Sequence, residues 1–204
     1  MCCMKRVCNG CAVAAAKRGM TDCPFCRAPT PDESQALAMI RKRVAAGDPM
    51  AIWNLGSQYC FGQCGLEKDM TRAVELYERA AELGEKEAHY NLGVLYAKGA
   101  ADVEKDTTKA FRHNEAAAMS GHVSARYNLG YMECEDGNYD LSLQHLMISA
   151  NLGHDNSMNN LKPALLDGLV TKADYAAALR GYQSAIEEMS SPDRDHAKAL
   201  ARTL

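Results

Sequence analysis

The clearest pattern in this chain of 204 residues is an apolar motif that returns at a fixed spacing. The tripeptide Asn-Leu-Gly occurs at 54–56, 91–93 and 128–130, which is a period of 37 residues each time. An alanine precedes each leucine by four residues, and residues four apart share one face of an α-helix. Each copy therefore predicts a helix with an apolar face. The motif positions that we expect to pack are Ala51, Leu55, Gly56, Ala88, Leu92, Gly93, Ala125, Leu129 and Gly130.

A second helix is predicted after each copy, over residues 69–84, 106–121 and 138–153. Each segment begins with Asp or Asn, which caps a helix N-terminus, and ends with Gly, which accepts the left-handed conformation at a C-terminus. Gly47 is an earlier end-glycine, so residues 33–47 are expected to be the second helix of an incomplete leading unit. The third copy has an internal loop that is shorter by five residues, and a weaker fourth copy follows at Asn160-Leu161.

Helix pairs of this kind cannot bury their apolar faces alone, so the units are expected to stack. Over about residues 34–190, the A-x-x-x-L-G-x-x-Y-x-x-G spacing resembles the Sel-1-like repeat family, a relative of the tetratricopeptide repeats. The resemblance implies an all-α fold, a right-handed α-solenoid of about four helix pairs. It also implies a platform for contacts with other proteins.

The cysteines gather at the start of the chain, where a short segment has no core that could bury them. Two C-x-x-C pairs occur there, and such pairs aim two thiolates at one metal ion. Residues 1–30 carry a net charge of +4, which favours the thiolates that zinc needs. A basic patch for nucleic acid is the competing interpretation of these charges, but Phe25 is the one aromatic residue there that could stack on bases. The predicted metal ligands are Cys2, Cys3, Cys8, Cys11, Cys23 and Cys26.

This cysteine segment resembles the second part of a RING-type zinc finger. The resemblance makes Cys8 and Cys11 the third ligand pair, and Cys23 and Cys26 the fourth. Cys3 matches the first member of the second pair, but Lys5 stands where the family has a histidine, and Cys2 could substitute for it. The first pair would lie upstream of Met1, so the sequence is expected to begin inside the motif.

Two zinc arrangements remain open at this point. One uses Cys2 and Cys3 together with the fourth pair, and the other places both C-x-x-C pairs around a single ion. By the same resemblance, Pro24 and Arg27 match residues that contact a ubiquitin-conjugating enzyme.

Composition and motifs narrow the classes of function. An apolar content of 47% excludes a wholly disordered chain, and the net charge of −3 argues against a dedicated nucleic-acid binder. The sequence has no apolar run long enough to cross a membrane and no apolar signal at its start. It also has no nucleotide-binding loop and no nucleophile elbow. We expect the six histidines to be surface or inter-helix residues.

The sequence thus predicts an intracellular protein, cytoplasmic or nuclear, with a partial RING-like zinc-binding segment over residues 1–30. A linker over residues 31–33 leads to the repeat solenoid over 34–190, and residues 191–204 form a cap or tail. The expected function is a non-enzymatic protein-interaction scaffold with zinc as its cofactor. The alternatives are a RING-type ubiquitin ligase (a ubiquitin-protein transferase) whose solenoid selects substrates, and a thiol-redox protein.

Overall fold

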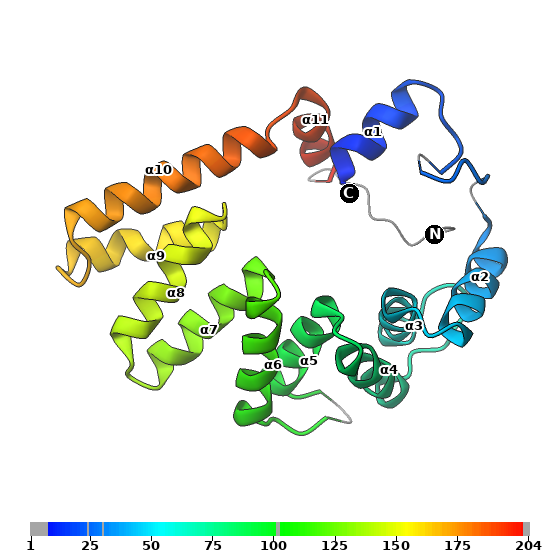
Figure 1. Ribbon diagram of the computed structural model, residues 1–204, viewed down its shortest axis with the longest axis horizontal. Coiled ribbons are helices and arrows are strands. Elements are labelled where there is room, and N and C mark those ends of the chain that lie inside the picture. Colours follow the sequence, from blue (N-terminus) through cyan, green and yellow to red (C-terminus); the bar gives the residue numbers. More distant parts are fainter. Residues whose placement is uncertain (1–7, 24, 30, 101–102, 202–204) are drawn as a thin grey trace. The chain divides into compact units, whose positions relative to one another are not determined.

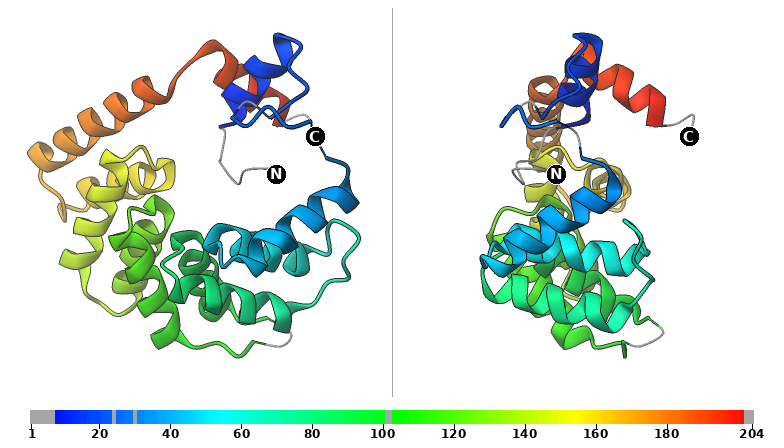
Figure 2. Two further views of the ribbon diagram at one scale, coloured as in Figure 1. Left: turned by 45° about the vertical axis from the view of Figure 1, so that its right-hand side comes forward. Right: turned by 90° about the vertical axis from the view of Figure 1, so that its right-hand side faces the viewer.

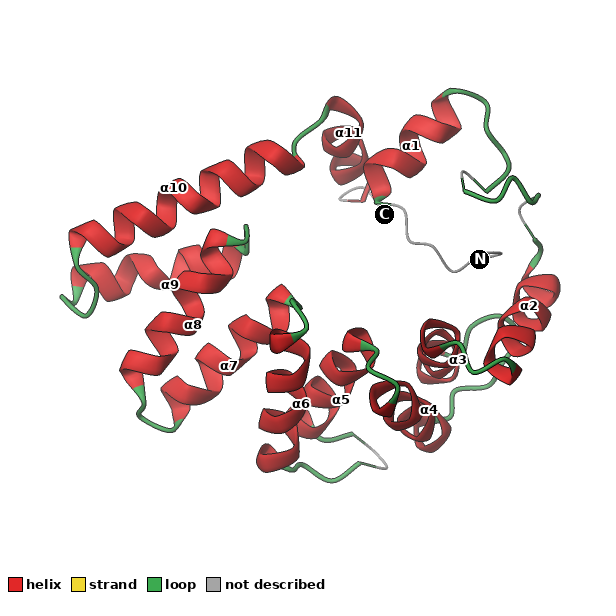
Figure 3. Cartoon of the chain, in the orientation of Figure 1, coloured by secondary structure: helices red, strands yellow, loops and turns green. Residues whose placement is uncertain are grey.

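A computed structural model describes residues 8–23, 25–29, 31–100 and 103–201 of the protein (Figure 1). Within these residues the regular structure is helical, and the only β-structure consists of two isolated bridges (Figure 3). The helices are α1 (Asn9–Lys17), α2 (Glu33–Ala45), α3 (Pro49–Phe61), α4 (Met70–Glu82), α5 (Lys86–Lys98), α6 (Thr107–Met119), α7 (Val123–Glu135), α8 (Tyr139–Asn151), α9 (Asp155–Leu166), α10 (Lys172–Met189) and α11 (Pro192–Ala201).

The chain divides into two compact units. The first unit comprises residues 1–80 and 189–204, and the second unit comprises residues 81–188. In the second unit, α5 packs on α6, α6 on α7, α7 on α8 and α8 on α9, so consecutive helices are neighbours in space. This is the all-α repeat arrangement that the 37-residue period predicts.

Capping side chains set the helix starts. Asp48, Asp69 and Asp106 each accept a hydrogen bond from a backbone N–H in the first turn of α3, α4 and α6. Asn138 was expected to cap α8 in the same way, but its side chain makes no cap. Its amide instead donates to the Glu133 carboxylate at 2.8 Å, so the cap prediction is wrong for this helix.

One hydrogen bond closes the loop inside each repeat. The N–H of Asp69 donates to the carbonyl of Tyr59 at 3.0 Å, and that of Asp106 donates to Tyr96 at 2.9 Å. In the third repeat the same bond runs from Asn138 to the carbonyl of Glu133 at 2.8 Å. The loop that is five residues shorter therefore ends at the same junction between the two helices.

The glycine of each Asn-Leu-Gly motif lies where the two helices of a repeat cross. A Cβ atom at Gly93 would lie 2.7 Å from the Asn114 side chain, and one at Gly56 would lie 2.9 Å from the Tyr77 ring. Real Cβ atoms do not approach other atoms so closely, because the overlap is strongly repulsive. The motif glycine thus lets the helices pack face to face.

A polar contact links successive repeats at this crossing. Asn114 is 1% exposed, and its amide donates to the carbonyl of Ala110 at 2.9 Å. Its carbonyl oxygen accepts from the amide of Asn128, in the next Asn-Leu-Gly motif, at 3.1 Å. Buried amides need such partners, and here the motif asparagine supplies one to the preceding helix.

In the first unit, α11 packs against α1 (Figure 2). Lys17 forms an ion pair with Asp193 at 2.8 Å, although 176 positions separate the two residues. Gly10 is buried in this contact, where a Cβ atom at its position would overlap Arg194. The segment expected to be a cap or tail therefore contains a helix that contacts the cysteine segment.

Candidate functional site

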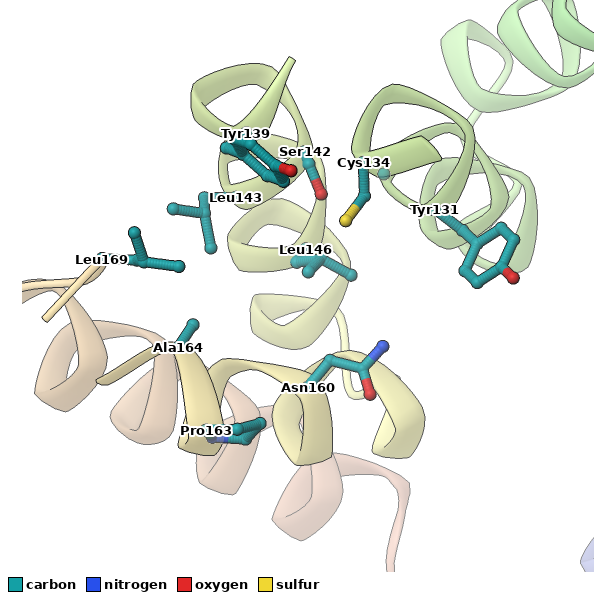
Figure 4. A pocket seen from close by; sticks show the side chains of 11 residues that line it. Tyr131, Cys134, Tyr139, Ser142, Leu143, Leu146, Asn160, Pro163, Ala164 and Leu169 are labelled. Carbon is teal, nitrogen blue, oxygen red and sulfur yellow. The ribbon is translucent and has the colours of Figure 1, made fainter. Parts of the chain in front are cut away.

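An apolar pocket lies in the second unit where α7, α8 and α9 meet (Figure 4). Its volume is about 300 Å³, at the lower end of the range for ligand-binding pockets. The residues that line it are Gly130, Tyr131, Cys134, Tyr139, Ser142, Leu143, Leu146, Asn160, Pro163, Ala164 and Leu169.

Three consecutive elements supply the floor and walls of this pocket. Leu146 on α8 and Ala164 on α9 are buried and form an apolar floor, and the buried Ser142 lies beside them on α8. The Cys134 sulfur is directed from α7 toward α8, and Leu169 lies beyond the end of α9 (Figure 4). The pocket therefore depends on the packing of one complete repeat against the helix that follows it.

The rim of the pocket carries large side chains that stay exposed. Tyr131 is 55% exposed, and Tyr139 and Leu169 are each 57% exposed. Tyrosine is enriched where proteins bind other proteins, because it offers apolar area together with a hydroxyl group at a low entropic cost. An apolar pocket with such a rim has the composition of a protein-contact site.

Carboxylates dominate the segments that build the rim. Glu135, Asp136, Asp140 and Asp167 are exposed there, whereas Lys162 is the one lysine or arginine within residues 131–143 and 160–169. The negative charge of the Glu135 carboxylate, followed by a hydrogen bond from the Tyr131 hydroxyl to it, raises the pKa of Tyr131. The exposed charges on these segments are therefore mostly negative, and two of them, Glu135 and Asp136, also line the neighbouring pocket beside α6 together with Arg112.

The shortened loop distinguishes this repeat from the two before it. In the first repeat, Leu66 of the loop packs beside Ala51 and Leu55, and in the second repeat Val103 of the loop is buried. The third repeat has only residues 136–138 between its helices, so it has no counterpart of either side chain. Its two helices are left uncovered at the end where the pocket lies.

The cysteine segment forms two separate local structures in its described residues. Cys8 lies at the N-cap of α1, and its sulfur accepts a hydrogen bond from the Cys11 N–H at 3.4 Å. Cys23 lies at a tight turn, in which the Arg27 N–H donates to the Cys23 carbonyl at 2.9 Å. The first C-x-x-C pair thus spans the start of α1, and the second begins at a turn that the Arg27–Cys23 hydrogen bond closes.

The environment of Cys8 favours its thiolate. The Cys11 N–H, followed by the Arg194 side chain, lowers the pKa of the exposed Cys8 thiol to about 7. A hydrogen bond with Cys8, followed by repulsion from the charge of its thiolate, raises the pKa of Cys11. One cysteine of this pair is therefore easier to ionise than the other.

The two pairs are not brought together in the described structure. Across residues 8–23, 25–29, 31–100 and 103–201, no group of three or more Cys, His, Asp or Glu side chains is arranged to hold a metal ion. The hypothesis that both C-x-x-C pairs surround one zinc thus finds no support in this part of the chain. Cys2 and Cys3, which the other arrangement needs, lie outside the described residues, as does Pro24.

The remaining predicted positions are found as follows. Arg27 is exposed and has a φ of 58°. The repeat positions that were expected to pack are buried. The alanines Ala51, Ala88 and Ala125 are 0% exposed, and the leucines are 0% (Leu92), 2% (Leu129) and 7% (Leu55) exposed. Gly93 is buried too. Gly56 and Gly130 are buried as well.

Of the pocket residues, only Gly130 is among the candidates drawn from the sequence, and there it was expected to pack between helices. Cys134, Tyr139 and Leu169 lie outside the repeat motif, and they come close together only because of how α8 and α9 pack. The shortened loop was the available signal, because a repeat that loses a covering side chain must expose what that side chain covered.

These features define a helical-repeat protein with an open pocket in one repeat. Sel1 repeats are matched at residues 49–85, 86–122 and 123–154, which together are just over half of the chain. The chain belongs to the Sel1 repeat family. The matched residues begin at 49, so the resemblance of the cysteine segment to a RING-type zinc finger stays a prediction.

Solved structures agree with this assignment. A Sel1 repeat protein from Oxalobacter formigenes is 25% identical with a TM-score of 0.66, over 88% of this chain and 72% of that one. The protective antigen c5321 of uropathogenic Escherichia coli, which displays an SLR fold, is 24% identical with a TM-score of 0.66. That likeness covers 83% of this chain and 36% of the antigen, and it shows the fold alone. No curated protein matches the chain.

Among the helices in the described residues, none combines the length and the apolar character needed to cross a bilayer.

Proposed function

We propose that this protein is a protein-interaction scaffold that holds a partner protein at the pocket of its third repeat. The observation that carries the proposal is the exposed rim of Tyr131, Tyr139 and Leu169 around an apolar floor. Sel1 repeat membership supports it, since a stacked helical repeat offers an extended surface for protein contacts. The chain supplies this surface as a binding element, without catalysis of its own.

A peptide selection tests this function without assuming a partner. Random peptides displayed on phage are selected on the immobilised full chain and then measured on two variants. Leu169→Ala removes a pocket wall, whereas Leu166→Ala removes a side chain that is 79% exposed and does not line the pocket. We expect peptides whose binding is weakened by the first change alone. If no peptide distinguishes the two variants, the pocket is not a protein-binding site.

We also propose that the cysteine segment binds zinc through Cys2, Cys3, Cys23 and Cys26. The tight turn from Cys23 to Arg27 supports this, because a closed turn presents two thiolates on one side. Zinc in such a site would stabilise the fold of the segment. Elemental analysis of the full chain should find zinc that is lost in the Cys23→Ala/Cys26→Ala variant and kept in Cys60→Ala/Cys64→Ala. A full chain without zinc contradicts this part of the proposal.

Ubiquitin transfer is the alternative function, and thiol-redox chemistry is a third. The exposure of Arg27 favours the former, because a residue that contacts a conjugating enzyme must be accessible. Self-ubiquitination by the full chain that falls in Arg27→Ala would support the ligase. The lowered pKa of Cys8 favours the latter, and thiols that react near neutral pH regardless of chelator would support it.

A further inference from the structure

The pocket of the third repeat has two properties that together restrict what it can bind. Its floor is apolar and desolvated, with Leu146 7% exposed and Ala164 9% exposed, so a charged group placed there would lose its hydration without a charged partner in the floor. Its rim is acidic. A ligand of this pocket must therefore have an apolar centre, and the groups that flank this centre must be neutral or positively charged.

The acidic groups are available to a ligand. Asp136 and Asp140 are exposed, and they lie close in sequence to the pocket residues Cys134 and Tyr139. The carboxylate of the buried Glu133 accepts a hydrogen bond from the Asn138 amide at the loop, so it is not available to a ligand at the rim. The exposed carboxylates create a field that attracts cations and repels anions at the entrance.

The opposing charge at this site is small. Lys162 is the single lysine or arginine on the lining segments, and it is exposed on α9 beside the pocket residue Pro163. An excess of exposed carboxylates over cations at an apolar pocket is complementary to a basic segment with an apolar side chain at its centre.

We infer that the third-repeat pocket binds a segment of a partner protein in which a leucine-like or aromatic side chain is flanked by lysines or arginines. The apolar side chain occupies the pocket between Leu146 and Leu169, and the flanking cations face Asp136 and Asp140. This inference rests on the proposed function and adds the chemistry of the partner to it.

Three sets of short dye-labelled peptides test the inference by fluorescence anisotropy with the full chain. All have two central leucines, and the flanking residues are lysine in one set, serine in the second and glutamate in the third. We expect the lysine set to bind at least about tenfold more tightly than the serine set, and the glutamate set not to bind. The preference should shrink as the salt concentration rises.

Matched variants separate the contributions of pocket and rim. Leu169→Ala should weaken binding of the lysine set about tenfold, as expected for an anchor contact, and Leu166→Ala should change it less than about twofold. Asp136→Lys/Asp140→Lys should abolish the preference for lysine flanks. The control Glu187→Lys/Glu188→Lys changes the charge equally on the exposed surface of α10 and should retain that preference. Circular dichroism verifies that every variant is folded.

Each remaining outcome contradicts either the inference alone or the inference together with the proposed function. If the serine set binds as tightly as the lysine set and Leu169→Ala weakens both, the scaffold function stands and the inferred basic partner is wrong. If lysine peptides bind equally to wild type and to Leu169→Ala, the attraction is nonspecific and the inference fails. If no set binds and the random-peptide selection also yields nothing, both the inference and the proposed function fail.

Discussion

The second and third repeats have the same architecture but use their shared surface differently. Both close their loop with an equivalent backbone hydrogen bond, yet the bonded residues are ten positions apart in the second repeat and five apart in the third. The helix crossing also differs, because the buried Asn114 of α6 is replaced by Leu146 in α8. The second repeat thus has a polar, covered junction, and the third has an apolar, open one.

The pockets beside these two repeats also differ in polarity, as the two helix junctions do. The pocket next to α6 has a volume of about 320 Å³, and its lining includes Thr107, Thr108, Arg112 and Glu135. The corresponding pocket next to α8 has Tyr139, Leu143 and Leu169 instead. A repeat fold therefore changes its binding surface locally, by a loop deletion and a few substitutions, while the helix packing is retained.

The largest expected effect comes from crowding the crossing of the second repeat. Gly93→Ala should lower the free energy of unfolding by about 2 kcal/mol, because the new Cβ displaces the hydrogen-bonded Asn114 amide. Gly130→Ala, at the same position of the third repeat, meets the Ser142 carbonyl oxygen at 3.1 Å and should cost about 1 kcal/mol. Urea unfolding measures both, and equal losses would mean that the two crossings do not differ.

The next effect concerns the contact between the two repeats. Asn128→Ala leaves the buried carbonyl oxygen of Asn114 without the Asn128 amide and should cost about 1–2 kcal/mol of unfolding free energy. Asn160→Ala changes the corresponding residue of the fourth copy, which is exposed, and should cost less than about 0.5 kcal/mol. A similar loss at both positions would show that the Asn128–Asn114 bond does not join the repeats.

Acid should weaken both repeats through partly buried histidines. Burial lowers the pKa of His89 and of His145 below 6.5, so the unfolded chain binds more protons than the folded one. Stability from these groups is complete above their unfolded pKa, and it is lost as the pH falls from there through the folded pKa. Unfolding midpoints at pH 7.5 and 5.5 should show this loss, and His89→Gln and His145→Gln should each reduce it. A loss that neither variant reduces would contradict this cause.

The smallest effect is expected from giving the third repeat a residue of the second. Cys134→Ala introduces the alanine that the second repeat has at residue 97, and it should change the unfolding free energy by less than about 0.5 kcal/mol because Cys134 is exposed. A lysine-flanked peptide should protect Cys134 from maleimide labelling in the wild-type chain. Protection of Cys60 instead would place the peptide on the first repeat.

The repeat helices could be predicted from the sequence because their determinants are local. Capping aspartates and end-glycines act within a few positions of a helix end, and the period of 37 residues repeats these signals. The end-glycines Gly47, Gly84, Gly121 and Gly153 all have positive φ angles. The prediction of a cap at Asn138 was wrong for a reason that is also local, because in the short loop the Asn138 amide donates to Glu133 instead.

The pocket and the contact between α1 and α11 could not be predicted in this way. Leu169 lies 35 residues from Cys134, and Asp193 lies far beyond Lys17 along the chain, so both depend on how helices pack. The pairing of the cysteines depends on similar long-range geometry. Their spacing predicts local turns around Cys8 and Cys23, but it does not determine which turns meet.

Photo-crosslinking tests the central claim, that the open third repeat is the binding surface, most directly. A lysine-flanked peptide with a photoreactive leucine analogue at its centre is bound to the full chain, irradiated and mapped by mass spectrometry. The account predicts crosslinks within residues 131–146 and 160–169, which are lost in Leu169→Ala. Crosslinks confined to residues 49–122 would contradict it, because the covered repeats would then be the ones that bind.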